Sequence, residues 1–121
     1  MTKQKLSEQQ LHQLVVDTID ANKGVNITSI DVRGKSSITD YMVIATGTSE
    51  RHVKALAEHV VTEAKKQGVT PLGIEGMKAC DWVLVDMADV MVHIMLEKTR
   101  DYYQLEKLWQ PDFADNNLAS A

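Results

Sequence analysis

The spacing of hydrophobic positions predicts two long amphipathic helices. In the first, over residues 7–23, apolar side chains recur every three to four residues, and Ser7 and Gln10 at its start have capping-box spacing. The second begins at Thr48 or Ser49 and ends at Gly68, after two lysines that suit a helix C-terminus. Its apolar stripe consists of Val53, Leu56, Ala57, Val60, Val61 and Ala64. Each helix can therefore bury one face against another layer.

Shorter apolar runs between and after these helices predict strands. NITSIDVRG alternates between apolar and polar residues, and DYMVIATG follows it after the polar connector GKSSIT. DWVLVD and VMVHIMLE form a second pair that only MAD separates, and Pro71 and Gly73 mark a short loop or edge strand before it. Because two connections are short enough for hairpins, a mixed sheet of four to five strands is favoured over an all-parallel one.

A third helix is predicted from about Lys98 to Trp109. It presents Tyr102, Leu105 and Trp109 on one side. We expect the aromatic residues Tyr102, Tyr103 and Trp109 to pack this helix onto the sheet, because the chain has too few aromatic residues for a base-stacking platform.

The order of these elements is helix, two strands, helix, two or three strands, helix. It predicts an α/β or α+β fold in which helices cover a mixed sheet. A chain of 121 residues is long enough for one hydrophobic core. We expect residues 1–110 to form a single domain and the small, polar stretch 111–121 to be a flexible tail.

Composition and charge narrow the classes of function. The net charge is −4, whereas a protein that binds nucleic acid non-specifically is normally basic, so a basic protein partner is favoured. The single cysteine, Cys80, excludes an internal disulfide framework and fits a reducing cytoplasm. No apolar run reaches the length of a membrane span, so we expect a cytoplasmic protein that does not enter a membrane.

The turn ATGTSERH is the first candidate for chemistry. Gly47, Thr48 and Ser49 follow a strand and open a helix, where such residues either hold a phosphate or satisfy the helix N-terminus. The chain has neither a Walker pattern nor GxGxxG, so capping is favoured and nucleotide binding is the alternative. The turn is similar to that of nucleotidyltransferases, but the paired strand carboxylates that hold their two magnesium ions are missing.

The histidines and the cysteine do not predict a metal site or a catalytic centre. His52 and His59 lie two helical turns apart, and no pair has the spacing of a zinc motif. Cys80 stands alone and is expected to be a small, semi-buried residue. His93 lies on an apolar strand, where a hydrogen-bonded structural role is favoured. We therefore predict no catalytic residue, no metal and no cofactor.

The second strand pair carries more carboxylates than a core needs. They are Glu75, Asp81, Asp86 and Asp89, against the single lysine Lys78. Strand alternation places Trp82, Leu84 and Asp86 on one face. It places Asp81, Val83 and Val85 on the other. A tryptophan flanked by charges is typical of an interface hot spot, and a core position is the common alternative. The carboxylates favour the interface.

Four stretches resemble the ribosomal silencing factor family, also called RsfS or Iojap. They are DYMVIATGTSERHVKALAEHV, the loop GVTPLGIEG, DWVLVDMADVMVHIM and RDYYQLEKLW, and the resemblance runs in order from about Leu11 to Trp109. The chain departs from the usual pattern at Ala88, where the family has glycine. This small-for-small change affects the turn rather than the function.

The resemblance implies a nucleotidyltransferase-like fold without catalytic carboxylates, and therefore no enzyme. It implies binding to the large ribosomal subunit through ribosomal protein L-fourteen. The bound factor would block joining of the small subunit and lower translation when nutrients are scarce. It also implies a homodimer when the protein is free, and little direct contact with RNA.

The resemblance also selects the region that would meet the partner, and strand alternation indicates which residues share a face. The predicted partner-binding residues are Glu75, Gly76, Lys78, Asp81, Trp82, Leu84, Asp86, Asp89, Met91 and His93. Trp82 and Leu84 would be the apolar anchors, and Asp81, Asp86 and Asp89 the polar partners. We expect some of the ten to belong to the core.

Overall fold

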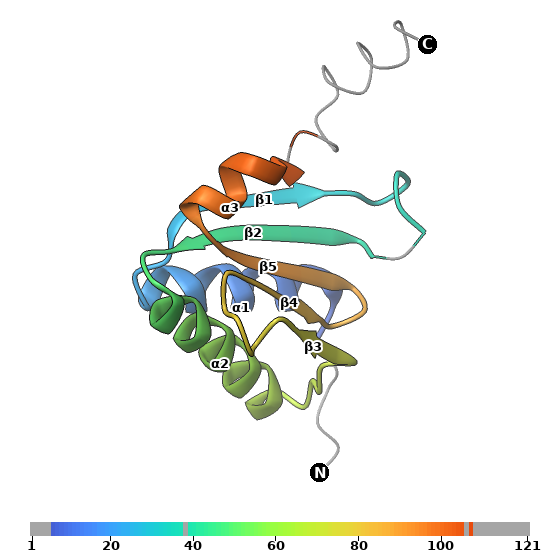
Figure 1. The fold of residues 1–121 in the computed structure, drawn as a ribbon. Helices are drawn as coiled ribbons and strands as arrows, with labels where there is room; N and C mark the ends of the chain where they lie inside the picture. Colours follow the sequence, from blue (N-terminus) through green and yellow to red (C-terminus); the bar gives the residue numbers. More distant parts are fainter. Residues whose placement is uncertain (1–5, 38, 106, 108–121) are drawn as a thin grey trace, which may run out of the picture.

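The computed structural model describes residues 6–37, 39–105 and 107 of the chain. Within them, a five-stranded mixed sheet is combined with three helices (Figure 1). The elements in chain order are α1 (Glu8–Ala21), β1 (Val25–Asp31), β2 (Tyr41–Gly47), α2 (Glu50–Lys66), β3 (Gly73–Glu75), β4 (Trp82–Asp86), β5 (Val90–Leu96) and α3 (Glu97–Tyr103). The strand order is β1-β2-β5-β4-β3. The predicted fold class and order of elements are confirmed, with β3 as the short additional strand.

The centre of the sheet is a parallel pair of strands. β2 and β5 pair along seven consecutive positions, from Tyr41 opposite Val90 to Gly47 opposite Leu96, whereas all other neighbouring strands are antiparallel. All seven residues of β2 are buried. A run buried on both faces of a sheet is typical of parallel pairing, because the connection between the strands covers one face with a helix.

α1 and α2 pack side by side on one face of the sheet (Figure 1). The main hydrophobic core lies between these helices and the strands. Its buried side chains include Val15, Ile19, Val43, Val53, Leu56, Val83, Val85 and Ile94. Removing this apolar surface from water is the main force that holds the two layers together.

Both long helices begin at the predicted caps. Ser7 Oγ accepts a hydrogen bond from the backbone N–H of Gln10 (3.1 Å), and the Gln10 side-chain oxygen accepts one from the backbone N–H of Ser7 (2.9 Å). This is a complete capping box. At α2, Ser49 Oγ accepts a hydrogen bond from the backbone N–H of His52 (3.1 Å). The predicted cap at Ser49 is therefore confirmed.

α3 lies on the opposite face and is held there by polar contacts. Its buried residues are Thr99 and Arg100. The Arg100 guanidinium donates hydrogen bonds to Thr46 Oγ1 of β2 (3.0 Å), to Thr28 Oγ1 of β1 (2.7 Å) and to the carbonyl oxygen of Asn26. Hydrogen bonds from a charged donor contribute about 1.5–3 kcal/mol each, so this side chain fixes α3 over β1 and β2.

The third helix is shorter than predicted. It ends at Tyr103, because Gln104 adopts the left-handed conformation with a φ of 49°. Leu105 follows and packs against a small apolar cluster of Met42, Ile44 and Met95, as expected for a residue directed at the sheet. Trp109, the predicted domain boundary at residue 110 and the tail 111–121 lie outside the described residues.

The prediction that Tyr102 packs onto the sheet is wrong. Its residue surface is 81% exposed, and that of Tyr103 is 53% exposed although its ring lies against Trp82. The reason is that Thr99 and Arg100 occupy the inward side of α3. Apolar periodicity could not reveal an inward face made of hydrogen-bonded polar residues.

A tight turn joins β4 to β5. Asp86 Oδ1 accepts a hydrogen bond from the backbone N–H of Ala88 (2.9 Å), and Ala88 has a φ of 67°. The left-handed conformation costs a residue with a Cβ roughly 1–2 kcal/mol, and glycine avoids this cost. Ala88 is therefore strained.

We predict that Ala88→Gly raises the free energy of unfolding by about 0.5–1 kcal/mol, because relief of strain exceeds the added entropy of the unfolded chain. Urea denaturation followed by circular dichroism measures the change. Ala79→Gly is the control, because Ala79 is also exposed but does not have a positive φ. A loss of stability in Ala88→Gly, or an equal gain in both variants, would contradict the prediction.

Candidate functional site

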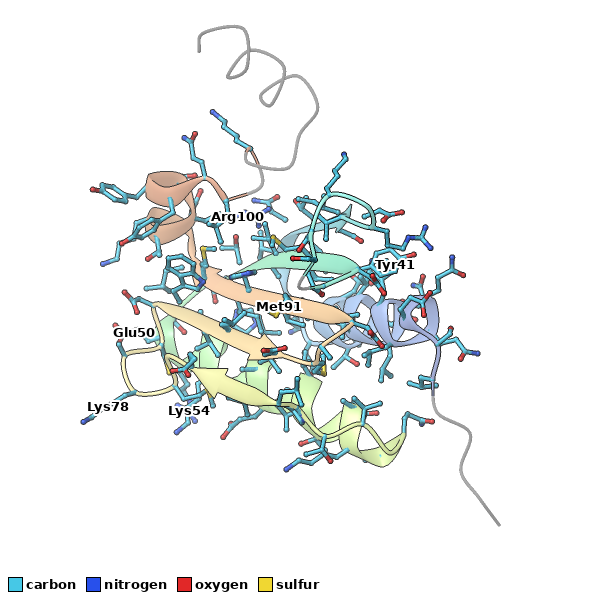
Figure 2. All side chains as sticks on the ribbon, turned by 90° about the vertical axis from the view of Figure 1, so that its right-hand side faces the viewer. Tyr41, Glu50, Lys54, Lys78, Met91 and Arg100 are labelled. Carbon is cyan, nitrogen blue, oxygen red and sulfur yellow. The ribbon has the colours of Figure 1, made fainter. Side chains whose placement is uncertain are left out.

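In the part of the chain that the structure describes, one face of the sheet is only partly covered. We call its residues on β3, β4 and β5 the open face. They lie on the side opposite α1 and α2, and they are Glu75, Trp82, Leu84, Asp86, Met91 and His93. Strand register brings them together, since Leu84 lies opposite both Glu75 and His93, and Asp86 lies opposite Met91. Directly opposed residues of paired strands point to the same face. Met91 is seen on this face in Figure 2.

Burial along β4 confirms the predicted alternation. Val83 and Val85 are fully buried under α1 and α2, while Trp82, Leu84 and Asp86 are half-buried. The two predicted apolar anchors therefore share a face with Asp86, as the sequence indicated. Their partial exposure means that the folded chain leaves apolar surface which a partner could cover.

Trp82 is held in place by His93. The indole N–H donates a hydrogen bond to His93 Nδ1 over 3.0 Å, and the two rings are 5.9 Å apart. His93 is only 8% exposed. Burial lowers the pKa of His93 from its ordinary value of 6.5 to about 4, so the ring is neutral at pH 7 and Nδ1 is free to accept. The expected structural role of His93 is confirmed, and it lies beneath the surface rather than on it.

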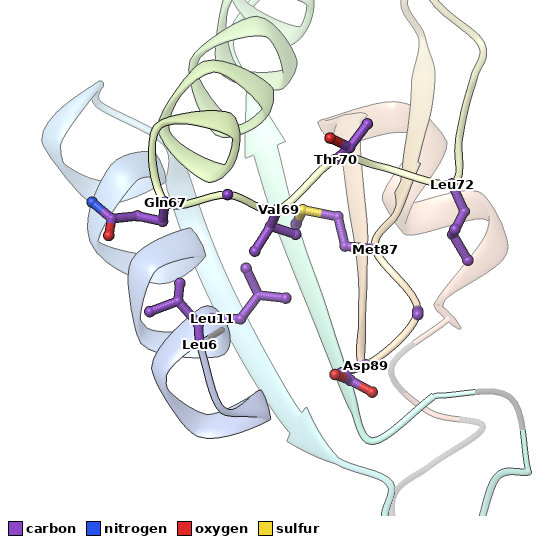
Figure 3. A pocket seen from close by; sticks show the side chains of 10 residues that line it. Leu6, Leu11, Gln67, Val69, Thr70, Leu72, Met87 and Asp89 are labelled. Carbon is purple, nitrogen blue, oxygen red and sulfur yellow. The ribbon is translucent and has the colours of Figure 1, made fainter. Parts of the chain in front are cut away.

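The predicted carboxylates do not all meet on the open face. Glu75 and Asp81 are exposed at the β3 and β4 ends of this region. Asp86 is half-buried and also holds the turn at Ala88. Asp89 instead lines a pocket of about 450 Å³ together with Leu6 and Leu11 of the first helix region (Figure 3). The structure therefore places Glu75 and Asp86 on the open face and Asp81 directly before Trp82 at the start of β4, but it places the Asp89 side chain elsewhere.

Gly76 and Lys78 lie in the connection between β3 and β4. Gly76 has a φ of 90°, and a Cβ at this position would stand 2.1 Å from the carbonyl oxygen of Trp82. Any side chain at Gly76 would thus displace Trp82, which makes this glycine a structural requirement of the open face. Lys78 is exposed at the outer edge of the same connection (Figure 2).

The Gly47-Thr48-Ser49 turn is used for capping. The backbone N–H of Thr48 donates to His52 Nδ1 (2.9 Å), while Ser49 Oγ accepts from the backbone of His52. A Cβ on Gly47 would approach the Val53 side chain to 2.6 Å, so glycine is needed where the helix meets the strand. A pocket of about 370 Å³ borders Gly47 and Thr48. The hydrogen bonds nevertheless support the capping interpretation, because they occupy donors that an anion would need.

Side chains that could bind a metal ion are not grouped within the described ranges. Among residues 6–37, 39–105 and 107, no three His, Cys, Asp or Glu side chains are grouped so that they could hold a metal ion. Cys80 is buried, and its Sγ donates to the carbonyl oxygen of Met77 (3.0 Å). None of the helices in this part of the chain is long and apolar enough to cross a membrane.

Sequence reasoning missed two features of this region. The ring of Tyr103 lies 4.8 Å from that of Trp82, and Tyr102 lies 4.9 Å from Tyr103. Neither tyrosine was assigned to the partner-binding set. The position of RDYY a few residues after the last strand was the only available signal, and it does not show on which side of α3 the rings lie.

We predict that His93 makes stability depend on pH. Its pKa is lower in the folded than in the unfolded chain, so the unfolded chain binds more protons between about pH 4 and 6.5. The contribution of the neutral His93 side chain to the free energy of unfolding is complete above pH 6.5 and is lost as pH falls towards 4. From about pH 7.5 to about pH 5, the wild-type chain should lose about 2 kcal/mol more than His93→Gln, whose amide oxygen still accepts from Trp82.

Urea unfolding at several pH values measures this difference. His59→Gln is the control for replacing a histidine, because His59 is exposed on α2, on the helix-covered side. Equal pH profiles for His93→Gln and the wild-type chain would show that His93 does not titrate in this way.

Comparison with known proteins relates the chain to one family. The family model described as "Ribosomal silencing factor during starvation" matches residues 5–120. The ribosomal silencing factor RsfS of Haemophilus influenzae is 50% identical over 99 residues, which cover 82% of this chain and 97% of that protein. A more distant mouse relative, named "Mitochondrial assembly of ribosomal large subunit protein 1", is 36% identical over 88% of this chain and 48% of its own length.

A solved structure shows that the likeness extends to the fold. The crystal structure of a Chromobacterium violaceum protein superposes with a TM-score of 0.84 at 41% sequence identity, over 86% of this chain and 87% of that chain. Sequence and fold therefore lead to the same conclusion. The chain belongs to the ribosomal silencing factor family.

Proposed function

We propose that the protein binds the large ribosomal subunit through ribosomal protein L-fourteen and thereby blocks joining of the small subunit. The family description refers to silencing during starvation, and the name of the mouse relative refers to the large ribosomal subunit. On this proposal, the protein represses translation under nutrient limitation. It acts in the cytoplasm and does so by occupying a surface, without a catalytic step.

The open face is the observation that carries this proposal. Trp82, Leu84 and Met91 form its half-buried apolar centre, and the carboxylates of Glu75 and Asp81 are exposed at its edge. An aromatic anchor within a polar rim is the usual composition of a protein interface. Trp82 is also pre-positioned by His93, so little side-chain entropy is lost when a partner covers it.

Charge supports a protein rather than an RNA partner. Ribosomal proteins are generally basic, so carboxylates on the open face would speed the encounter with such a protein and fix its orientation. The net charge of −4 would at the same time oppose non-specific attachment to RNA phosphates. The proposal therefore includes little direct contact with RNA.

We predict that Trp82→Ala weakens binding to purified large subunits at least about thirtyfold, because it removes a central anchor of hot-spot type. Glu75→Arg should weaken binding about tenfold, because it reverses a charge at the rim. Glu75 is a cleaner test than Asp86, since Asp86 also holds the β4–β5 turn. Co-sedimentation with separated subunits measures the affinities, and circular dichroism verifies the fold.

Glu58→Arg is the matched control. Glu58 is exposed on α2, on the helix-covered side, so the same charge reversal there should leave binding unchanged. Added small subunits should form fewer joined particles with the wild-type protein than with Trp82→Ala. If Trp82→Ala and Glu75→Arg both bind like the wild type, the open face is not the docking surface.

The proposal also includes a homodimer of the free protein, as in the resembled family. Sedimentation velocity over a range of concentrations measures this state. The expected result is a concentration-dependent shift from monomer to dimer. A single monomeric species at every concentration would contradict this part of the proposal.

A further inference from the structure

Three aromatic rings form a continuous series that leads from the open face onto α3. We call Trp82, Tyr103 and Tyr102 the aromatic ladder. The centroids of Trp82 and Tyr103 are 4.8 Å apart with an interplanar angle of 49°, and those of Tyr103 and Tyr102 are 4.9 Å apart with an angle of 76°. Exposure rises along the series, from a half-buried Trp82 to a Tyr102 that is 81% exposed.

The outer rings are not needed to hold α3 on the sheet. Thr99 and Arg100 are its buried residues, and the Arg100 guanidinium makes hydrogen bonds to three oxygens of β1 and β2. Tyr102 contacts the ring of Tyr103 edge-on and otherwise faces solvent. The exposed rings of Tyr102 and Tyr103 are continuous with the open face, and their aromatic surface is available for a partner.

Charges of both signs lie in the segments around the ladder. Asp81, Glu97 and Asp101 are exposed there, and so are Lys78, Lys98 and Lys107. Asp81 lies next to the start of α3, because its carbonyl oxygen accepts a hydrogen bond from the backbone N–H of Leu96 (3.0 Å). Exposed carboxylate residues thus precede Trp82 and Tyr102, the inner and outer ends of the ladder, directly in the sequence.

Aromatic faces combined with carboxylates favour one kind of side chain. A guanidinium group is planar, always charged and weakly hydrated, so it stacks on aromatic rings while its N–H groups bind carboxylates. A lysine ammonium group is more strongly hydrated and lacks the planar shape for stacking. The chemistry of this surface therefore matches arginine.

We propose that the aromatic ladder receives an arginine side chain of the basic protein on which the open face docks. This inference rests on the proposed function and adds to it the residues Tyr102 and Tyr103 and the chemical group that they recognise. α3 thereby extends the docking surface beyond the strands. The arginine stacks on the tyrosine rings and pairs with Asp81 or Asp101.

Binding of purified large subunits tests the ladder. Tyr102→Leu, which keeps an apolar side chain but removes the aromatic face, should weaken binding about tenfold, whereas Tyr102→Phe should bind within about twofold of the wild type. Tyr102 suits this test because its exposure makes loss of folding an unimportant factor. Wild-type affinity in Tyr102→Leu, or an equal loss in Tyr102→Phe, would overturn the proposal.

A second measurement tests the guanidinium without the ribosome. In a Trp109→Phe background, Trp82 is the remaining tryptophan, and its fluorescence can follow titration with hexa-arginine or hexa-lysine peptides. Hexa-arginine should bind at least about threefold more tightly than hexa-lysine, and Tyr102→Leu should remove this preference. Equal binding of the two peptides, or a preference that survives in Tyr102→Leu, would overturn the assignment.

The outcomes separate this inference from the proposed function. If Trp82→Ala loses large-subunit binding but Tyr102→Leu does not, the docking face stands and the ladder fails. If Trp82→Ala binds normally while hexa-arginine is still selected, the docking proposal fails and the arginine site remains. If Tyr102→Leu abolishes the dimer in sedimentation velocity but leaves large-subunit binding intact, a second copy of the chain occupies the ladder, and the arginine proposal is wrong.

Discussion

The parallel pairing of β2 with β5 is the constraint on which the rest of the structure depends. These strands lie at the centre of the sheet, and every residue of β2 is buried, so apolar side chains must be covered on both faces. α1 and α2 cover one face of this central pair. Within the described residues, the helix on the other face is α3, which has seven residues and lies over β1, β2 and β5. The side chains of β4 and β3 on that face are therefore left partly open.

This partial cover explains the form of the candidate site. Val83 and Val85 enter the core, so strand geometry turns Trp82 and Leu84 towards the uncovered side. A half-buried tryptophan there needs a partner for its N–H group, and His93 on the neighbouring strand supplies it. The same bond requires a neutral imidazole, which burial of His93 provides. The stability of the sheet and the geometry of the surface are thus coupled through one hydrogen bond.

The sequence predicted correctly those structural features that depend on nearby residues alone. Helical periodicity in α1 and α2, the caps at Ser7 and Ser49 and the alternation along β4 all predicted correct elements, because each depends on neighbours only a few residues away. The position of Asp89 could not be obtained in this way. It depends on how the turn meets α1, which is a contact between segments far apart in the chain.

Which side of α3 faces the sheet could not be predicted from the sequence, for a different physical reason. A short helix normally directs its aromatic residues inward, because their burial stabilises the fold most. Here Arg100 takes the inward position, and its hydrogen bonds to Thr28 and Thr46 hold the helix without them. Compared with a helix that packs through apolar residues, α3 has its polar residues on the buried side and its aromatic residues on the exposed side. Polar contacts fix the helix, and the aromatic side chains Tyr102 and Tyr103 stay at the surface beside Trp82, where they can act in binding at little cost to the fold.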